Sequence, residues 1–412
     1  MFQDYSHKSF DLFDGIFLQF FYSPMEDVQV RAFKGTYGSF PEVYSSAPGR
    51  INLIGEHTDY NLGYVLPAAI DLHVSFLASR REDDMVHIRA ESFDQKKCFS
   101  IRKNIDERQG GWLDYVKGIY WILLRKGIPL GGINAYVWGN IPLESGLSSS
   151  AALEVSIIHA LDSLFDLNLN PLEMAKSAQA AENDYVGVKC GLMDQFISVF
   201  GKKDKAVFLD CETLAYEYIP LHLKRQGLGI LVYDTRVSRD LASSPYNMRR
   251  AEASHALEKL REFGVNTYKD ISPSLLEEKK GVLGETLYLR ARHVVSENER
   301  VKKAIMALHD EDFQEMGQLL FQSHESLRDD YQVSCPELDL LYEYGRQSSS
   351  CLGARLTGAG FGGSGIALVY KEDIPCFRSH ISSEARKKGF VAPACHEVEI
   401  GEGVRTRRKG ED

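Results

Sequence analysis

The sequence predicts an α+β protein of two domains, and three observations support this. Its 412 residues exceed what one compact core usually organises. Strand-like and helix-like segments follow each other irregularly, without the strict βαβ order of a doubly wound sheet. Apolar residues make up 44% and charged residues 26%, as in ordinary globular proteins. We expect an extension at 1–30 and domains at 31–220 and 221–412.

The first predicted domain begins with strands. Residues 44–93 are rich in β-branched side chains, with Gly and Asn at the breaks. Residues 112–126 show helical spacing of apolar side chains, and 133–139 return to a strand pattern. A long helix follows the loop at 142–150, and a second helix begins at Pro171, where Asn170 can act as its cap.

The second predicted domain is mainly helical. Residues 225–235 form a strand, and helices then dominate from Tyr246 to about Tyr344. Strands return at 357–370 and near 390–400. No repeat of fixed period interrupts this order, so repeat architectures are excluded.

The two ends of the chain are expected to lie outside the predicted domains. Phe10, Phe13, Phe17 and Phe20 would share one face of an amphipathic helix, to which no function is assigned. This stretch lacks the basic start of a signal peptide, and no later run is long and apolar enough for a spanning helix. The tail at 405–412 is expected to be solvated and disordered.

Charge and cysteine usage narrow the class of partner. With 58 acidic and 48 basic side chains the net charge is −10, which disfavours nucleic acid or an anionic membrane and favours a small-molecule ligand. The seven cysteines form no C-x-x-C pair and no zinc-like spacing. We therefore expect reduced thiols and a cytoplasmic protein.

A serine-rich loop is the first candidate site. The run Gly146, Leu147, Ser148, Ser149, Ser150 stands between a predicted strand and a predicted helix. A helix N-terminus leaves amide groups without intrahelical partners, so it attracts phosphate oxygens. The run is not a Walker loop, because no G-x-x-x-x-G-K-[ST] occurs there. A serine-capped helix without a ligand is the alternative.

A glycine-rich segment at 356–365 is the second candidate. It contains a formal G-x-G-x-x-G, but we expect a helical region before it and a strand at 366–370 after it. A dinucleotide fingerprint needs a strand before and a helix after, so that interpretation is rejected. Dense glycine lets the backbone approach a ligand closely, and a tight turn is the alternative.

Polar side chains supply acid, base and hydrogen-bonding candidates. Arg50, Glu56, His57 and Asp59 lie within ten residues around a turn and could bind vicinal hydroxyls, or form a surface salt-bridge group. Asp194 could be a base, or only a turn residue. The helical Glu182 could reach a metal, or be solvated. The residues alone do not decide between the functional and the structural interpretation in these three cases.

Several motifs in one order give the chain a resemblance to galactokinases within the GHMP kinase family. GRINLIGEHTDYNLGYVLP resembles the galactokinase signature, GLSSSAALE the phosphate loop of the family, and LTGAGFGG its third motif. CGLMDQF, YNMRRAE, RARHVVSENER and SHESLRDDYQVSCPELD also match. The resemblance covers about Tyr37 to Glu399 and implies an N-terminal domain like ribosomal protein S5 domain 2 and a ferredoxin-like C-terminal domain.

The resemblance also implies an activity, an ATP-dependent sugar 1-kinase that acts on galactose with Mg²⁺. Asp194 would be the catalytic aspartate, and Arg50 would stabilise it and the transferred phosphoryl group. The implied sugar ligands are Glu56, His57, Asp59, Asp194 and Tyr246. The implied nucleotide ligands are Trp112, Gly146, Leu147, Ser148, Ser149 and Ser150. Ser150 and Glu182 would hold Mg²⁺, which prefers such hard oxygen ligands.

The chain departs from the family pattern in three places. Glu144 and Ser145 stand where the family usually has small residues, and a carboxylate near a triphosphate costs energy unless it turns away or meets the metal. Before Tyr246, Ser238 replaces a usual basic residue, although the next one, Arg239, is kept, and Pro245 replaces a usual acid. Ser364 for a frequent cysteine is conservative.

Two alternatives therefore accompany galactokinase. One is a kinase of the same fold for galacturonate, N-acetylgalactosamine or arabinose, since the loss of an acid at Pro245 would reduce repulsion of a substrate carboxylate. The other is a non-catalytic galactose sensor. The sequence leaves the oligomeric state between a monomer and a weak homo-oligomer.

Overall fold

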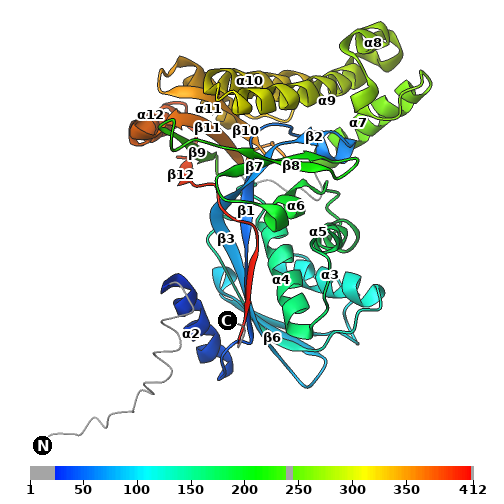
Figure 1. Ribbon diagram of the computed structural model, residues 1–412, viewed down its shortest axis with the longest axis vertical. Helices are drawn as coiled ribbons and strands as arrows, with labels where there is room; N and C mark the ends of the chain where they lie inside the picture. The colour runs from blue at the N-terminus through cyan, green and yellow to red at the C-terminus, as the bar shows by residue number, and fades with distance from the viewer. Residues whose placement is uncertain (1–23, 238–244, 410–412) are drawn as a thin grey trace, which may run out of the picture.

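The computed structural model describes residues 24–237 and 245–409. It confirms two α+β parts, stacked along the long axis of the molecule (Figure 1). The predicted helix with four phenylalanines lies outside the described residues, as do Ser238 and Arg239. No described helix combines the length and apolar character needed to cross a membrane.

The first part is built on a six-stranded sheet of order β13-β1-β3-β6-β4-β5. Neighbouring strands are antiparallel, except that β4 and β6 run parallel. Its strands are β1 (Val43–Asn52), β3 (Pro67–Arg80), β4 (Met85–Ala90), β5 (Gln95–Ser100), β6 (Ile133–Gly139) and β13 (Arg405–Arg408). Its helices are α2 (Pro24–Tyr37), α3 (Trp112–Arg125), α4 (Ser149–Phe165), α5 (Pro171–Ala180) and α6 (Met193–Phe200).

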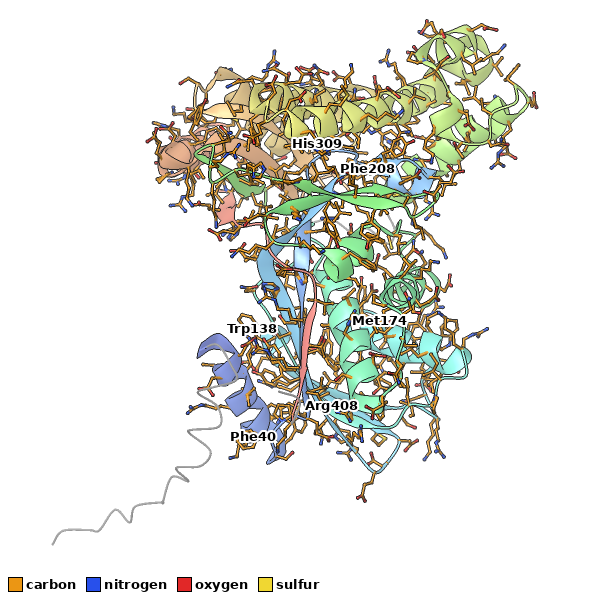
Figure 2. All side chains as sticks on the ribbon, viewed as in Figure 1. Phe40, Trp138, Met174, Phe208, His309 and Arg408 are labelled. Carbon is orange, nitrogen blue, oxygen red and sulfur yellow. The ribbon has the colours of Figure 1, made fainter. Side chains whose placement is uncertain are left out.

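Helices cover both faces of this sheet. The long helix α4 packs directly on β1 and β3, with α3, α5 and α6 around it on the same side (Figure 1). On the other side, Phe33 of α2 is wholly buried against Leu77 and Tyr136 of the sheet. Phe40 and Trp138 border that cluster (Figure 2). The predicted boundary at residue 30 therefore divides a helix that packs with the first part.

The second part places helices against a four-stranded antiparallel sheet of order β10-β11-β9-β12. The strands are β9 (Leu228–Asp234), β10 (Cys351–Thr357), β11 (Ser364–Tyr370) and β12 (Ala394–Val398). The helices are α7 (Pro245–Arg261), α8 (Pro273–Glu278), α9 (Lys280–His309), α10 (Phe313–Ser326), α11 (Pro336–Gln347) and α12 (Ile374–Lys387). The backbone of α9 leaves helical geometry at Gly284, where φ is 71°.

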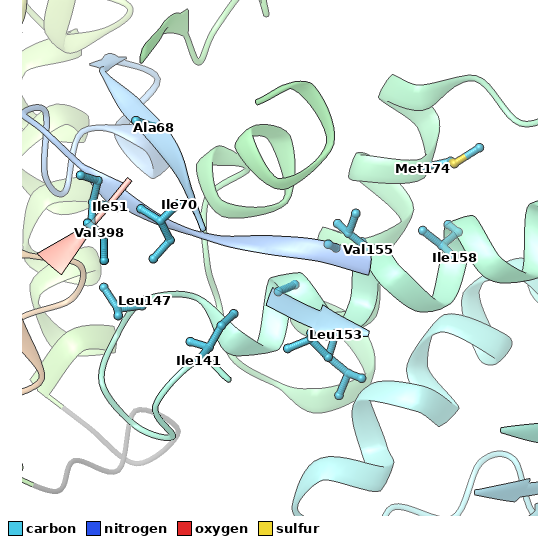
Figure 3. Packing of buried hydrophobic residues seen from close by; sticks show 14 of the residues in the cluster. Ile51, Ala68, Ile70, Ile141, Leu147, Leu153, Val155, Ile158, Met174 and Val398 are labelled. Atoms are coloured by element: carbon cyan, nitrogen blue, oxygen red, sulfur yellow. The ribbon is translucent and has the colours of Figure 1, made fainter. Parts of the chain in front are cut away.

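The two parts share a core, and helix α9 of the second part packs against a third, small sheet. That sheet has the order β2-β7-β8, made of β2 (Tyr64–Val65), β7 (Lys205–Asp210) and β8 (Tyr216–Pro220). Ile51 and Ile70 of the first part lie beside Val398 of the second in one hydrophobic cluster (Figure 3). Burial of this joint surface holds the parts together.

The C-terminal end of the chain corrects the prediction for the tail. Residues 405–408 form β13, which pairs with β1 in the register Val43↔Arg408 to Ser46↔Arg405. The prediction of a disordered tail is therefore wrong for these residues, and the chain ends against the first part. Basic side chains fit there because β13 is an edge strand whose side chains reach solvent.

Candidate active site

A cavity of about 480 Å³ brings together distant segments of the chain. Its walls come from the loop after β1 (the β1 loop, residues 53–63), the loop before α3, the serine-rich loop before α4 (the serine loop, residues 140–148), and the turn before α6. The start of α7 and the glycine segment (residues 358–363) complete the walls. The predicted site residues among its lining are Arg50, Glu56, His57, Asp59, Gly146, Ser148, Ser149, Ser150, Glu182, Asp194 and Tyr246.

A bidentate ion pair lies in the wall of this cavity. Arg50 Nε donates to Asp194 Oδ1 and Nη2 donates to Oδ2, each at 2.8 Å. Arg50 is buried and its third nitrogen, Nη1, donates to the Gly146 carbonyl at 2.7 Å. Ser148 Oγ also donates to Asp194 Oδ2. Such charge-assisted fork contacts are strong and directional, so they fix the orientation of Asp194.

The serine loop exposes a helix N-terminus to the cavity. Ser148 is the residue before α4, but its hydroxyl bonds Asp194 and does not cap the helix. Its backbone is left-handed, with φ 63°, and Glu144 and Gly146 also have positive φ. Ser149 and Ser150 form the first turn and line the cavity. The free amide groups of this turn favour an anion there.

Two predicted nucleotide residues do not line the cavity. The Leu147 side chain is wholly buried in the core (Figure 3), and its carbonyl accepts from Arg50 N at 3.0 Å. The predicted role of Leu147 is therefore limited to its backbone. Trp112 stacks on Phe93 and donates to Gln95 Oε1, while its neighbours Gly110 and Gly111 form the wall.

In the β1 loop, the Glu56 carboxylate is held by three donors. Gly358 N donates to Oε1 at 2.9 Å, and Arg355 Nη2 and Asn52 Nδ2 donate to Oε2 at 2.6 and 3.1 Å. Only 2% of Glu56 is exposed, although it lines the cavity. Two of these donors, Arg355 and Gly358, belong to the second part of the chain and Asn52 to the first, so both parts fix the carboxylate.

The His57 ring is neutral, and both its nitrogens have partners. Burial, and then the neighbouring His293, lower the pKa of His57 to about 3. Nε2 lies 3.2 Å from the Ala359 carbonyl, so it carries the proton, and Nδ1 accepts from Tyr60 Oη at 2.7 Å. A ring contact to a ligand hydroxyl would replace one of these bonds.

The Asp59 carboxyl group also lines the cavity, and its surroundings disfavour its charged form. Burial, and then the negative charge of Asp194, raise the pKa of Asp59 to about 7. It lies so close to Gly191 that a Cβ there would come within 1.9 Å of Oδ2. Glycine at 191 is therefore what leaves room for Asp59.

Glu182 offers a buried carboxylate beside Ser150. It lies in a π-helical turn, Ala181–Val186, and its carboxylate hydrogen-bonds with the hydroxyl of Ser150. Gln195 Nε2 and Cys190 Sγ donate to Glu182 Oε2 at 2.7 and 3.3 Å. Burial, and then Asp194, raise the pKa of Glu182 to about 7. A cation at this place would relieve the unfavourable burial of charge.

The glycine segment lies at the cavity as expected, but one part of its context was predicted wrongly. The strand β10 leads into it, where a helical region was expected, and β11 follows. It therefore joins two antiparallel strands, and the absence of a following helix still excludes a dinucleotide fold. Gly358 has φ 81°, and its amide bonds Glu56.

Comparison with known proteins assigns the family. The galactokinase galactose-binding signature matches residues 31–80, and models of the N terminal and C terminal domains of GHMP kinases match 114–202 and 303–385. A galactokinase of Thermotoga petrophila is 42% identical over 358 residues, which cover 87% of this chain and 98% of the relative. The chain belongs to the galactokinase family. As a member it is a sugar kinase, a phosphotransferase with an alcohol group as acceptor.

Further galactokinases agree along nearly the whole chain. The galactokinase of Pyrococcus furiosus is 44% identical over 326 residues, covering 79% of this chain and 88% of that protein. The crystal structure of Lactococcus lactis galactokinase complexed with galactose has a TM-score of 0.89 at 39% identity and covers 92% of this chain and 99% of that one. A mevalonate kinase structure, with a TM-score of 0.62 and 18% identity, shares the fold.

The galactokinase motifs contain most of the cavity, yet some lining residues were missed. Tyr60, Asp114, Tyr115, Cys190 and Gly191 all line it. Each lies within three residues of a predicted site residue except Cys190, which lies four residues before Asp194 in the quoted run CGLMDQF. Their closeness in the sequence to predicted site residues was the signal that could have found them. Arg355, which bonds Glu56 from β10, gave no such signal, because the segment before the glycines was expected to be helical and no pattern there marks a buried arginine.

The raised pKa of Asp59 predicts a pH-dependent gain in stability for Asp59→Asn. A folded-state pKa of about 7, above the unfolded value near 4, means that stability is lost as the pH rises from about 4 to about 7. Removing the charge should raise the unfolding free energy at pH 8 by on the order of 1 to 3 kcal/mol, and by less at pH 5. Urea unfolding of the ligand-free protein at both pH values measures this.

A matched control for Asp59→Asn is Asp204→Asn. Asp204 is exposed, and asparagine suits its left-handed backbone at φ 57°. That variant should show no stability gain that grows with pH. Equal unfolding free energies of Asp59→Asn and the parent at pH 8 would show that the buried charge of Asp59 does not destabilise the fold.

Proposed function

We propose that the chain transfers the γ-phosphoryl group of ATP to the anomeric hydroxyl of D-galactose, giving α-D-galactose 1-phosphate and ADP. The observation that carries this proposal is the Arg50–Asp194 pair, which lies where the β1 loop and the serine loop meet in one cavity. The Lactococcus lactis relative, solved as a complex with galactose, supports the choice of sugar.

The sugar would occupy the part of the cavity bordered by the β1 loop. Glu56, His57, Asp59 and Tyr246 line that part and can bond hydroxyl groups, with Asp194 beside the anomeric one. Glu56 and Asp59 accept from hydroxyls, whereas the Tyr246 hydroxyl can donate or accept. Several groups that converge on one small ligand favour a defined orientation.

The nucleotide phosphates would lie at the N-terminus of α4. Gly146, Ser148, Ser149 and Ser150 surround this end, and the amides of the first turn have no side-chain cap. Helix-end amides and the helix dipole stabilise phosphate oxygens without a lysine. Trp112, behind the cavity wall at Gly110 and Gly111, is proposed for the adenine side.

Ser150 and Glu182 are proposed to hold Mg²⁺. A hydroxyl and a carboxylate in contact are the hard oxygen ligands that this ion prefers. In the described parts of the chain no three His, Cys, Asp or Glu side chains form a ready metal cluster, which suits an ion that also takes phosphate and water oxygens. When bound, Mg²⁺ neutralises charge on the β- and γ-phosphates.

The residues of the chain then act by position and charge. Asp194, fixed by Arg50 and Ser148, orients the anomeric hydroxyl and accepts its proton as the oxygen attacks the γ-phosphorus. The Arg50 guanidinium offsets the negative charge that spreads over the transferred phosphoryl group. ADP leaves with the bond between the γ-phosphorus and the bridging oxygen broken.

The free thiols fit the proposed cytoplasmic location. All seven cysteines are unpaired, which is usual where the cell keeps thiols reduced. We also propose that the partners of the protein are small molecules only, and that it is a monomer or a weak homo-oligomer.

A sugar-panel assay tests the proposed reaction. ADP release with ATP and Mg²⁺ is measured for galactose, galacturonate, N-acetylgalactosamine and arabinose, with an EDTA-treated sample as control. We expect the highest kcat/KM with galactose and no release in EDTA. Turnover of galacturonate with galactose inert would reassign the substrate, and release from no sugar would favour a sensor.

A further inference from the structure

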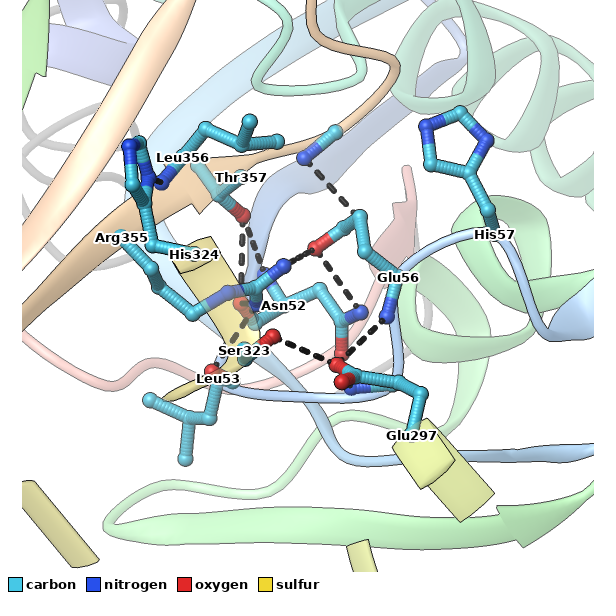
Figure 4. Close-up of polar contacts among 12 residues, drawn as sticks. Asn52, Leu53, Glu56, His57, Glu297, Ser323, His324, Arg355, Leu356 and Thr357 are labelled. Carbon is cyan, nitrogen blue, oxygen red and sulfur yellow. Dashed lines mark hydrogen bonds and ion pairs between the residues drawn. The ribbon is translucent and has the colours of Figure 1, made fainter. Parts of the chain in front are cut away.

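A buried arginine of the second part reaches into the β1 loop of the first. Arg355 of β10 is completely buried, and its Nη1 donates to the carbonyls of Asn52 and Leu53, each at 2.9 Å. Its Nη2 donates to Glu56 Oε2 at 2.6 Å (Figure 4). One guanidinium thus holds both the backbone where the loop begins and the carboxylate that lines the cavity.

The hydrogen bonds that hold Glu56 leave one acceptor position of its carboxylate for a ligand. A carboxylate has about four acceptor positions on its two oxygens. Arg355 and Asn52 take both positions of Oε2, and Gly358 N takes one of Oε1. One acceptor position on Oε1 is left. The carboxylate can therefore accept from a ligand hydroxyl without losing any of the bonds that hold it.

Other residues hold the backbone of the same loop. Glu297 Oε1 accepts from Gly55 N at 2.9 Å, and His293 Nε2 lies 3.0 Å from the Glu56 carbonyl (Figure 4 shows Glu297). Both belong to α9 and are buried. The path of the backbone at 55 and 56 is thus fixed without Arg355, so the separate contribution of Arg355 there is to the Glu56 side chain.

We propose that Arg355 is a positioning residue for sugar binding, because it turns the Glu56 carboxylate so that Oε1 meets a hydroxyl of the sugar. This inference rests on the proposed function. Both parts of the chain then form the sugar site, because Arg355 of β10 orients Glu56, which the β1 loop supplies. Arg355 acts through Glu56 and does not itself line the cavity.

The test measures sugar and nucleotide binding separately in Arg355→Gln and Arg355→Lys. Galactose affinity is measured by calorimetry without ATP, and KM for galactose, KM for ATP and kcat by ADP release. Loss of a well-placed bond to a charged acceptor predicts a galactose affinity roughly ten- to a hundred-fold lower in Arg355→Gln. KM for ATP should stay unchanged. Lysine keeps the charge but not the fork, so its loss should be smaller.

A double variant separates positioning from general damage. Arg355→Gln leaves a buried carboxylate without its ion-pair partner, which can destabilise the fold. Arg355→Gln combined with Glu56→Gln removes both charges. If Arg355 acts through Glu56, the double variant should bind galactose no more weakly than Glu56→Gln alone. Additive losses in the double variant would overturn the inference, as would parent-like affinity in Arg355→Gln.

Lys269→Gln serves as the matched control. Lys269 also joins the two parts of the chain, through an ion pair with Asp210 of β7 at 2.8 Å, but it does not line the cavity. The Lys269→Gln variant should have a lower melting temperature than the parent and the same affinity for galactose. A parent protein that binds no sugar of the panel overturns the proposed function and this inference with it. Parent turnover with unaltered Arg355 variants overturns the inference alone.

Discussion

Asp194→Asn is expected to lower kcat by a factor of about 10² to 10⁴ while galactose and ATP still bind. The amide keeps the size of the side chain but cannot accept the proton of the anomeric hydroxyl. It also sets an NH₂ group against one of the Arg50 donors, which now bond both carboxylate oxygens at 2.8 Å. The loss should therefore fall on the chemical step. Single-turnover ADP formation, with substrate affinities from calorimetry, measures it.

The control for Asp194→Asn is Asp83→Asn. Arg81 Nε and Nη2 donate to the two oxygens of Asp83 at 2.8 and 2.6 Å, so this pair has the same fork geometry outside the cavity. Its loss should leave kcat unchanged. Equal kcat for Asp194→Asn and the parent would contradict the proposed role of Asp194. No transfer by either protein would favour the sensor alternative.

Arg50→Lys is expected to reduce kcat/KM by about 10² to 10³, although the charge is conserved. Arg50 uses three nitrogens at once, two on Asp194 and one on the Gly146 carbonyl. An ammonium group is a single point and cannot reproduce that fork. The variant should misplace Asp194 and weaken stabilisation of the transferred phosphoryl group, so kcat should fall more than KM changes.

Arg81→Lys is the matched control for Arg50→Lys. It also exchanges a forked arginine for lysine, but at the more exposed Arg81–Asp83 pair. Steady-state kinetics of the two variants should differ strongly, with Arg81→Lys equal to the parent. A parent-like kcat/KM in Arg50→Lys would show that the position needs only a positive charge.

The elements set by local pattern were predicted well. The helix after the serine loop is α4, and Asn170 caps α5 by accepting from Leu172 N, as the sequence indicated. Such features depend on residues a few positions apart, which a single sequence displays. The same reasoning gave the irregular order of strands and helices and hence the α+β class.

Features that depend on distant pairing were missed. The tail looked disordered because Arg405–Arg408 is short and basic, and its partner β1 lies more than three hundred residues earlier in the chain. The strand β10 was missed before the glycine segment, and with it the inward direction of Arg355. No local pattern marks a buried arginine whose partners are carbonyls and a carboxylate of another segment.

The candidate site followed from the motifs more than from single residues. Arg50, Asp194 and the serines each had an ordinary structural alternative, and the fold places Arg50 and Asp194 together at one cavity, which supports the proposed catalytic role of the pair. Leu147 shows the limit of carrying a motif over as a block, since its side chain belongs to the core. The roles of the sugar, nucleotide and metal ligands stay predictions until variants are measured.

The position of the new phosphate tests the proposed reaction most directly. The product of galactose, ATP and Mg²⁺ is examined by ³¹P and ¹H NMR, beside a sample with methyl α-D-galactopyranoside, in which the anomeric oxygen is blocked. We predict a phosphate on C1 of α-D-galactose and no product from the methyl glycoside. A phosphate on any other carbon, or transfer to the methyl glycoside, would contradict phosphorylation of the anomeric hydroxyl.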